Sequence, residues 1–174
     1  MIKPKDIRIR SETSKDISDI HALNIAAFET DAEAMLVNRL REKKEFFLSI
    51  VAAYRKKIVG HILFTPVEVE HNPQKIKTAG LAPMAVSPQL QNHGIGSALV
   101  HSGLTLCAQS GYQVVFVLGH ETYYPRFGFK PARSHGLFYR SEEFDPYFFV
   151  IDLNKHNLDN LKGEVSFDSE FESA

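Results

Sequence analysis

The sequence predicts a single α+β domain built on a mixed β-sheet, and three observations lead to this fold class. Hydrophobic residues occupy 44% of the 174 positions, which is enough to fill a core. Two segments with helical periodicity come early and are followed by segments rich in β-branched and aromatic residues. Val114–Leu118 is a short, continuous apolar run, the pattern of a strand buried on both faces. We expect one domain over residues 1–174, with its core at about 5–153.

The N-terminal part of the chain predicts one strand followed by two helices. Residues 7–10 alternate between apolar and polar side chains, as a half-buried strand does. Thr13 and Ser14 can cap a helix that runs to about Phe28, because their hydroxyl groups accept hydrogen bonds from its free N–H groups. A second helix is expected over residues 32–42.

The next part predicts a β-hairpin. Residues 47–54 and 58–70 are rich in β-branched and aromatic side chains, and the basic segment 55–57 lies between them. We expect this basic segment to be a solvated turn. Pro66 is expected to bend or fray the second strand, because proline has no N–H to donate.

The rest of the chain predicts further strands around one helix. Residues 77–86 read as a strand, and the helix after it is expected to end near Ser110, with Gly111 as its cap. Another strand is expected at 147–153. The acidic tail, residues 162–174, fits either a short edge strand or a loose end.

Composition argues against several classes of partner. The net charge is −1, from 20 basic and 21 acidic residues, so no overall field favours nucleic acid. The start, MIKPKDIRIR, lacks the apolar centre of a signal peptide, and no apolar run approaches the ~20 residues that cross a bilayer. The single cysteine, Cys107, suits a reducing compartment. We therefore expect a cytoplasmic protein that binds neither nucleic acid nor membranes.

One polar stretch, QNHGIG, separates the strand at 77–86 from the helix that follows. Pro88 prevents the strand from continuing regularly, and Gly94 and Gly96 remove side chains where the helix begins. A helix start carries unpaired N–H groups and the positive end of the dipole, so an anion such as a pyrophosphate can bind there. A plain strand–helix connection explains the two glycines equally well.

Two common phosphate-binding motifs do not fit this stretch. The P-loop requires a lysine before its serine or threonine, and Gly96-Ser97 has none. The dinucleotide fingerprint requires a third glycine and an early position in the chain.

The residues resemble the GNAT (GCN5-related) N-acetyltransferase superfamily, and are most similar to its bacterial YhbS-like branch. Residues 91–96 match its Q/R-x-x-G-x-G/A loop, and residues 124–129 match its Y-x-x-x-G-F segment. Two helices followed by a hairpin fit the same order, and the resemblance covers residues 7–153. It implies a central, mostly antiparallel mixed sheet that is splayed between two central strands and flanked by helices.

The resemblance also implies where acetyl-CoA, a cosubstrate, would bind. The backbone N–H groups of the loop would hold its pyrophosphate, and the pantetheine arm would pair with the preceding strand. The implied residues are Met84, Ala85 and Val86 on the strand, and Gln91, Asn92, His93, Gly94, Ile95, Gly96 and Ser97 in the loop.

The implied reaction is direct attack of a neutral amine on the thioester. Tyr124 aligns with the tyrosine that protonates the departing thiolate in many members, and Tyr123 is its neighbouring competitor. The segment 119–123 offers no asparagine, although many relatives carry one shortly before this tyrosine. The base is open, with Glu29 placed first; the alternatives are ordered water and the side chains of Asp31, Glu33, Glu68, Glu70 and His120.

Three functions remain open at this point: an N-acetyltransferase, a non-catalytic acyl-CoA-binding or sensing domain of the same fold, and an unrelated nucleotide-binding domain. The acceptor of an acetyltransferase would be a small amine or a protein amine. The eight histidines show no paired helical spacing, so no metal is expected. The fold is compatible with a homodimer.

Overall fold

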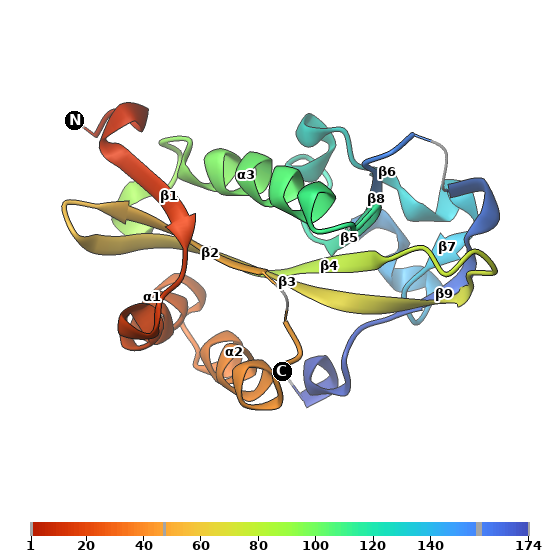
Figure 1. The fold of residues 1–174 in the computed structure, drawn as a ribbon, viewed down its shortest axis with the longest axis horizontal. Coiled ribbons are helices and arrows are strands. Elements are labelled where there is room, and N and C mark those ends of the chain that lie inside the picture. Colours follow the sequence, from red (N-terminus) through yellow and green to blue (C-terminus); the bar gives the residue numbers. More distant parts are fainter. Residues whose placement is uncertain (1, 47, 156–157, 174) are drawn as a thin grey trace. The chain divides into compact units, whose positions relative to one another are not determined.

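A computed structural model describes residues 2–46, 48–155 and 158–173 (Figure 1). The helices are α1 (Ile17–Phe28), α2 (Ala32–Lys43) and α3 (Ile95–Gln109). The strands are β1 (Ile7–Ser11), β2 (Leu48–Tyr54), β3 (Lys57–His71), β4 (Thr78–Val86), β5 (Val114–Leu118), β6 (Lys130–Pro131), β7 (Leu137–Phe138), β8 (Phe148–Asp152) and β9 (Lys162–Ser166). Short 3-10 turns connect them, among them η2 (Ser14–Asp16), η3 (Pro88–Leu90), η4 (Tyr124–Phe127) and η8 (Ser169–Ser173).

The strands follow the order β1-β2-β3-β4-β5-β8-β6, and β9 pairs with both β3 and β7. The pairs β1–β2, β2–β3, β3–β9, β5–β8 and β6–β8 are antiparallel, whereas β4–β5 and β7–β9 are parallel. The β4–β5 ladder ends where Leu81 meets Val117, although β4 itself continues to Val86. The predicted mixed, mostly antiparallel sheet with flanking helices is confirmed.

The chain packs as two compact units. The first contains Met1–Phe64, Pro83–Gly103 and Ser169–Ala174, and the second contains Thr65–Ala82 and Leu104–Asp168. Strands β3 and β4 and helix α3 each continue from one unit into the other. The single domain expected over residues 1–174 stays a prediction.

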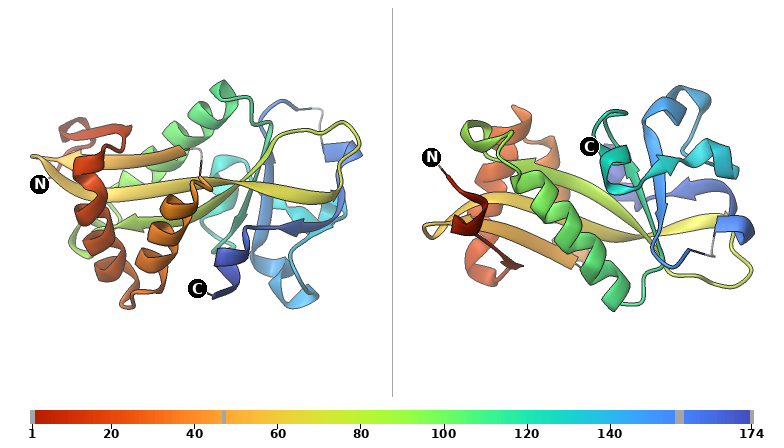
Figure 2. Two further views of the ribbon diagram at one scale, coloured as in Figure 1. Left: turned by 60° about the horizontal axis from the view of Figure 1, so that its bottom comes forward. Right: turned by 90° about the horizontal axis from the view of Figure 1, so that it is seen from above.

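The first unit places helices on both faces of β1, β2 and the start of β3. Figures 1 and 2 show α1 and α2 side by side below these strands, and α3 above them. On the lower face, Ile20 and Leu40 pack against Val51 and Leu63. The C-terminal turn η8 is fixed to α2, because the Glu170 carboxylate accepts hydrogen bonds from Arg39 and Lys43 at 2.8 and 2.7 Å.

A chain of buried polar groups also crosses the lower face. The Glu12 carboxylate accepts hydrogen bonds from Arg41 and from the Ser49 hydroxyl, each at 2.7 Å. Because the Ser49 proton is used there, Nε2–H of His61 donates to Ser49 Oγ at 2.9 Å. The other ring nitrogen faces the Asn24 amide at 3.5 Å. Burial, and then the positive charge of Arg41, lowers the pKa of His61 to about 3, so the imidazole is neutral.

The second unit is held together largely by aromatic rings. Phe116 on β5 stacks on Phe148 of β8, with centroids 5.6 Å apart and planes 5° from parallel. Tyr139 stacks on the same Phe148 at 5.6 Å and meets Phe167 edge-on, also at 5.6 Å. Aliphatic side chains of β3, β5, β8 and β9 complete this core.

Most predicted elements form within one or two residues of their expected ends, with two differences. Of the bending or fraying expected at Pro66, fraying does not occur: β3 continues through the proline, which lies between the ladder with β2, ending at Phe64, and the ladder with β9, which includes Glu68. Part of the tail forms β9, which is not an edge strand because it has partners on both sides. The predicted strand start at Phe47 lies outside the described residues. No helix in the described ranges is both long enough and apolar enough to span a bilayer.

Candidate functional site

The predicted phosphate loop begins where β4 leaves the sheet. The Ser87 N–H donates to the Val59 carbonyl of β3 at 2.8 Å, and η3 then turns the chain, with Leu90 N–H bonded to Ser87 O at 2.8 Å. The side chain of Gln91 reaches back to Val86 O at 3.3 Å. These bonds hold the start of the loop against β3 and the end of β4.

The loop itself is exposed and uses left-handed backbone conformations. Residues Gln91 to Gly94 are all exposed, with φ of 63° at Asn92 and 83° at Gly94. A Cβ atom added to Gly94 would meet no atom within 4 Å, so the space over this residue is open. His93 is folded inward onto the loop, with Nδ1 at 2.7 Å from Gln91 O. The open space allows a bulky group to approach the backbone.

The N–H groups at the start of α3 are the polar groups that the loop presents. The first i to i−4 bond of the helix runs from Ala98 N–H to Gly94 O at 3.0 Å. The N–H groups of Ile95, Gly96 and Ser97 come before that bond and therefore have no partner within the helix. The positive end of the helix dipole lies at the same place. This arrangement can bind an anion with several oxygens, such as a pyrophosphate.

Two glycines, which the sequence analysis did not identify, fix α3 against the sheet. A Cβ atom on Gly60 of β3 would lie 2.9 Å from Leu99 and 3.0 Å from Ile95. A Cβ atom on Gly103 would lie 2.5 Å from the ring of Phe64. Because a Cβ atom at either position would press on these side chains, the two glycines allow the helix to lie close to the strands. Glycine inside strand or helix patterns was the signal that could have identified them.

The acidic candidates of the first unit gather at the junction of α1 and α2. Glu29 ends α1 in a left-handed conformation, φ 60°, and its N–H bonds to Ile25 O at 3.1 Å. Asp31 precedes α2, and its carbonyl accepts from Met35 N–H at 2.8 Å. Glu33 is half-buried and accepts from the Thr30 hydroxyl at 3.3 Å, whereas Glu29 and Asp31 are exposed. The junction presents negative charge to solvent.

Tyr124 lies in the second unit, inside an aromatic cluster. Its ring meets Tyr123 edge-on at 5.0 Å and Phe129 edge-on at 5.7 Å, and only 8% of the residue is exposed. A Cβ atom on Gly119 would lie 2.2 Å from Cε2 of Tyr124, so this glycine is required for the ring to pack there. Burial, and then the neighbouring Tyr123, raises the pKa of Tyr124 above its ordinary value. The phenol therefore stays protonated at neutral pH.

The remaining base candidates of the second unit are exposed. Glu68 and Glu70 project from β3, and Glu70 already accepts a hydrogen bond from Glu164 N–H of β9 at 3.0 Å. His120 follows β5, and its carbonyl accepts from Tyr123 N–H at 3.1 Å. The Glu70 carboxylate therefore already has a hydrogen-bond partner within the protein.

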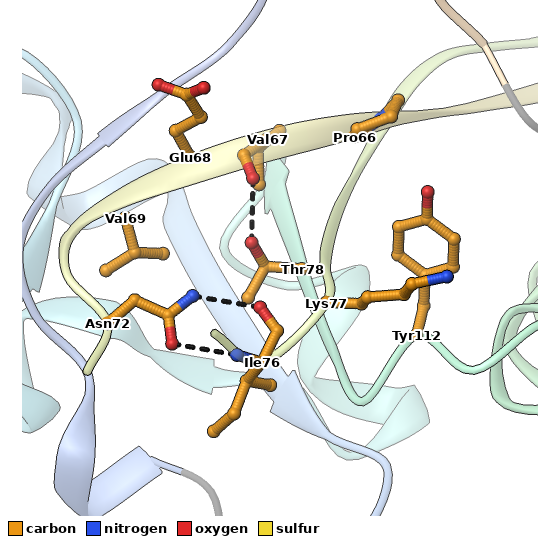
Figure 3. Close-up of a pocket in the computed structure, with 9 residues that line it drawn as sticks. All are labelled: Pro66, Val67, Glu68, Val69, Asn72, Ile76, Lys77, Thr78 and Tyr112. Atoms are coloured by element: carbon orange, nitrogen blue, oxygen red, sulfur yellow. Dashed lines mark hydrogen bonds between the residues drawn. The ribbon is translucent and has the colours of Figure 1, made fainter. Parts of the chain in front are cut away.

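A shallow hollow of about 300 Å³ lies in the second unit (Figure 3). Most polar groups on its wall are bonded to one another: Thr78 donates to Val67 O at 2.8 Å, and the Asn72 amide bonds to Ile76 at 2.9 Å in both directions. The Lys77 ammonium lies 5.6 Å from the centre of the Tyr112 ring. Its lining includes Glu68 but neither Tyr124 nor any residue of the loop. We assign no chemistry to this hollow.

Across residues 2–46, 48–155 and 158–173, no three His, Cys, Asp or Glu side chains are grouped in a way that could hold a metal ion. The hydrogen bonds described above involve nitrogen and oxygen atoms of the chain alone.

Comparison with known sequences gives matches along most of the chain. A family model described as an acetyltransferase (GNAT) domain matches residues 8–132. The chain is 35% identical over 164 residues to the uncharacterized N-acetyltransferase YhbS of Escherichia coli K12, covering 94% of this chain and 97% of that protein. It is 43% identical over 119 residues to the uncharacterized N-acetyltransferase YjhQ of the same strain, covering 67% of this chain and 66% of that protein.

Comparison with solved structures also finds GNAT family acetyltransferases. The crystal structure of YhbS from Escherichia coli in complex with CoA superposes with a TM-score of 0.90 at 34% identity, covering 96% of this chain and 92% of that one. A GNAT family acetyltransferase from Brucella melitensis in complex with acetyl-CoA gives a TM-score of 0.77 at 30% identity, covering 95% and 97%.

Proposed function

Because the chain belongs to the GNAT acetyltransferase family, we propose that it transfers the acetyl group of acetyl-CoA to a primary amine. The observation that carries this proposal is the exposed loop at the start of α3, where N–H groups without helical partners lie under open space at Gly94. Two similar proteins were solved with CoA or acetyl-CoA bound, which supports CoA as the anion for this loop.

The loop residues Gln91 to Ser97 hold the pyrophosphate in this proposal, mainly through backbone N–H groups. The pantetheine arm pairs with Met84, Ala85 and Val86 in the manner of an added strand. This assignment is supported by the length of β4, which continues five residues beyond the end of its ladder with β5 at Leu81. CoA is a cosubstrate here, and the proposed chemistry requires no metal.

In the proposed reaction the amine nitrogen attacks the thioester carbonyl carbon. The new C–N bond forms, the C–S bond breaks, and the thiolate leaves with the electron pair of that bond. Tyr124 donates its phenolic proton to this sulfur as the charge develops, and it recovers a proton from solvent afterwards. Since burial raises the pKa of this phenol, transfer is favourable only in concert with C–S cleavage.

The amine must lose a proton to a base, and we propose Glu29 for this role. Its carboxylate is exposed at the junction of the two helices, next to Thr30 and Asp31. A water molecule held between Glu29 and the amine would serve equally well as a relay. Glu70 is a weaker choice because its carboxylate already accepts the Glu164 N–H.

The acceptor class follows from the charge at this junction. Exposed carboxylates at Glu29 and Asp31 attract a cationic amine before it is deprotonated. We therefore propose a small amine with more than one positive charge, or a lysine-bearing peptide, as the acceptor.

The direct test is turnover of acetyl-CoA with a panel of polyamines, amino sugars and lysine peptides. CoA release is followed with a thiol reagent, and the acetylated product is identified by mass spectrometry. The protein contributes little background, because Cys107 is fully buried and burial raises its thiol pKa to about 12. We expect CoA release to match the acetylated product one to one for at least one amine.

Two other outcomes would contradict the proposal in different ways. Tight CoA binding without transfer to any amine would favour the acyl-CoA-sensing alternative. Failure of CoA to bind at all, seen as an unchanged melting temperature at saturating concentration, would exclude both functions.

A further inference from the structure

The turn between β2 and β3 places cationic residues where short hairpins ordinarily have asparagine and glycine. Tyr54 pairs with Lys57, so Arg55 and Lys56 are the two turn residues. Their φ angles are 47° and 67°, both left-handed, as the common two-residue hairpin turns require. This conformation is unfavourable for long side chains that carry a Cβ atom. A cationic pair at such positions points to a role for the charges themselves.

This turn lies at the same end of the first unit as the phosphate loop (Figures 1 and 2). Ser87, where the loop region begins, is bonded to Val59 of β3 at 2.8 Å. Val59 follows Lys57 by two residues, which is roughly 7 Å along a strand. A Cβ atom added to Gly60, the next residue, would lie 3.0 Å from Ile95 in the first turn of α3. The turn and the helix start are therefore close neighbours within one unit.

The charges of the turn are not neutralised by any ion pair among the described residues. Some cations of this unit are paired with carboxylates, among them Arg10 with Asp16 at 2.6 Å and Arg41 with Glu12 at 2.7 Å. Over the part of the chain that the structure describes, none of the three turn cations forms such an ion pair. All three side chains are exposed, and the turn is a concentrated positive surface.

One contact within the turn orients the first of these cations. The Arg55 guanidinium lies 5.1 Å from the centre of the Tyr54 ring. This stacking holds the guanidinium near the end of β2 and leaves its N–H groups available at the edge. The three cations that make up the turn cluster are Arg55, Lys56 and Lys57.

From this placement we infer that the turn cluster binds the 3′-phosphate of CoA and so selects CoA over dephospho-CoA. The inference rests on the proposed function, because it takes the pyrophosphate to be held by the neighbouring loop. The ribose of CoA carries this phosphate a few bonds beyond the pyrophosphate, so a cation beside the loop can reach it. Guanidinium donates paired hydrogen bonds to phosphate oxygens, and ammonium adds a compact charge.

The test compares the dissociation constants of CoA and dephospho-CoA by isothermal titration calorimetry. The variant Arg55→Asn/Lys56→Gly removes two charges and supplies the residues that this turn geometry favours, so folding is not compromised. For the unaltered protein we expect CoA to bind about tenfold more tightly than dephospho-CoA, from two or three exposed phosphate contacts. In the variant, which keeps only Lys57 of the cluster, this ratio falls well below tenfold, while dephospho-CoA affinity is unchanged.

A matched control removes two cations elsewhere in the same unit. Lys44 is exposed and left-handed, φ 57°, at the end of α2, and Lys15 is exposed before α1. The variant Lys15→Gln/Lys44→Asn therefore changes the net charge equally. It should keep the tenfold ratio, which shows that the effect belongs to the turn and not to overall charge.

The outcomes separate this inference from the function on which it rests. An unaltered protein that binds CoA, with a ratio that the turn variant leaves unchanged, overturns the inference alone. Equal weakening of both ligands also overturns it, because the turn would then act on the loop and not on the 3′-phosphate. Binding of neither ligand to the unaltered protein would refute the proposed function itself.

Discussion

The two units of this protein are stabilised by different chemistry. The first adds polar links between elements to its aliphatic core, such as the ion pair of Arg10 with Asp16 and the buried chain from Arg41 to His61. The second relies on stacked and edge-on rings, such as Phe116 on Phe148. The proposed binding loop belongs to the first unit and is made of backbone, whereas the proposed acid, Tyr124, belongs to the second and depends on one side chain.

This contrast predicts different sensitivities. A backbone site tolerates side-chain changes except where glycine is needed, whereas a side-chain site fails when one atom is removed. Low pH should lower the stability of the first unit, and altered ring packing should lower the stability of the second. The following predictions test these differences, beginning with the largest.

The largest expected effect is that of Tyr124→Phe. Removing the phenolic oxygen removes the proposed proton donor, and general acid catalysis is worth about 10²- to 10⁴-fold in rate. We expect kcat to fall within that range while the Kd of CoA is unchanged, measured by product formation and by calorimetry. Tyr123→Phe, in the neighbouring ring, is the control and should retain activity. Unchanged kcat in Tyr124→Phe would remove the tyrosine from the mechanism.

The second prediction concerns acid and His61. Burial keeps the folded-state pKa of His61 at about 3, whereas an unfolded histidine titrates near 6.5. Between these values the unfolded chain binds more protons, so the free energy of unfolding falls as pH falls from about 6.5 towards 3. By pH 4 this amounts to about 3 kcal/mol, measured by urea unfolding at several pH values.

A matched pair of variants isolates this histidine. His61→Gln keeps a donor for Ser49 but cannot titrate, so the pH dependence between 6.5 and 4 should become shallower. His71→Gln changes an exposed histidine of the second unit and should leave the slope as it is. Equal slopes in the unaltered protein and in His61→Gln would show that the buried imidazole does not control acid stability.

The third prediction concerns the aromatic unit at Gly119. In Gly119→Ala the new Cβ atom would lie 2.2 Å from the Tyr124 ring, and overpacking of this kind costs about 1–3 kcal/mol. Urea unfolding should show that loss, and kcat should fall with it because the ring is displaced. Combining Gly119→Ala with Tyr124→Leu should recover part of the stability and none of the activity. No recovery would mean that the methyl group clashes elsewhere.

The smallest expected effect is that of Gly94→Ala in the loop. The left-handed φ of 83° makes alanine unfavourable by about 1 kcal/mol, although no atom of the protein would be touched. The methyl group enters the space proposed for the pyrophosphate, so the Kd of CoA should rise about tenfold, equivalent to about 1.4 kcal/mol. Asn92→Gly, which relaxes a left-handed residue nearby, should bind CoA normally. Unaltered CoA binding in Gly94→Ala would place the anion elsewhere.

The sequence predicted elements and the loop well because their signals are local. The 3.6-residue period of α2 and the continuous apolar run of β5 lie within single segments, and QNHGIG marks its helix start directly. The resemblance to GNAT proteins added the order of the elements, and the comparisons confirm that family.

Contacts between distant segments were not predictable in this way. The chain of Glu12, Ser49 and His61 joins the residue after β1 to strands β2 and β3, and the sequence marks the latter two only as polar residues inside apolar runs. Gly119 resembles an ordinary turn glycine until the Tyr124 ring is seen against it. The base remained open for a related reason: Glu29, Asp31 and Glu68 are all exposed carboxylates, and exposure alone does not distinguish them.

The central claim is that the backbone of the loop binds the pyrophosphate of CoA. At 19.7 kDa the protein is small enough for amide NMR, and titration with CoA reports on each N–H group separately. We predict that the amide resonances of Gly94, Ile95, Gly96 and Ser97 shift together, with one common Kd. We also predict that Gly94→Ala raises that Kd. Binding of CoA that leaves these four amides unshifted would contradict the claim.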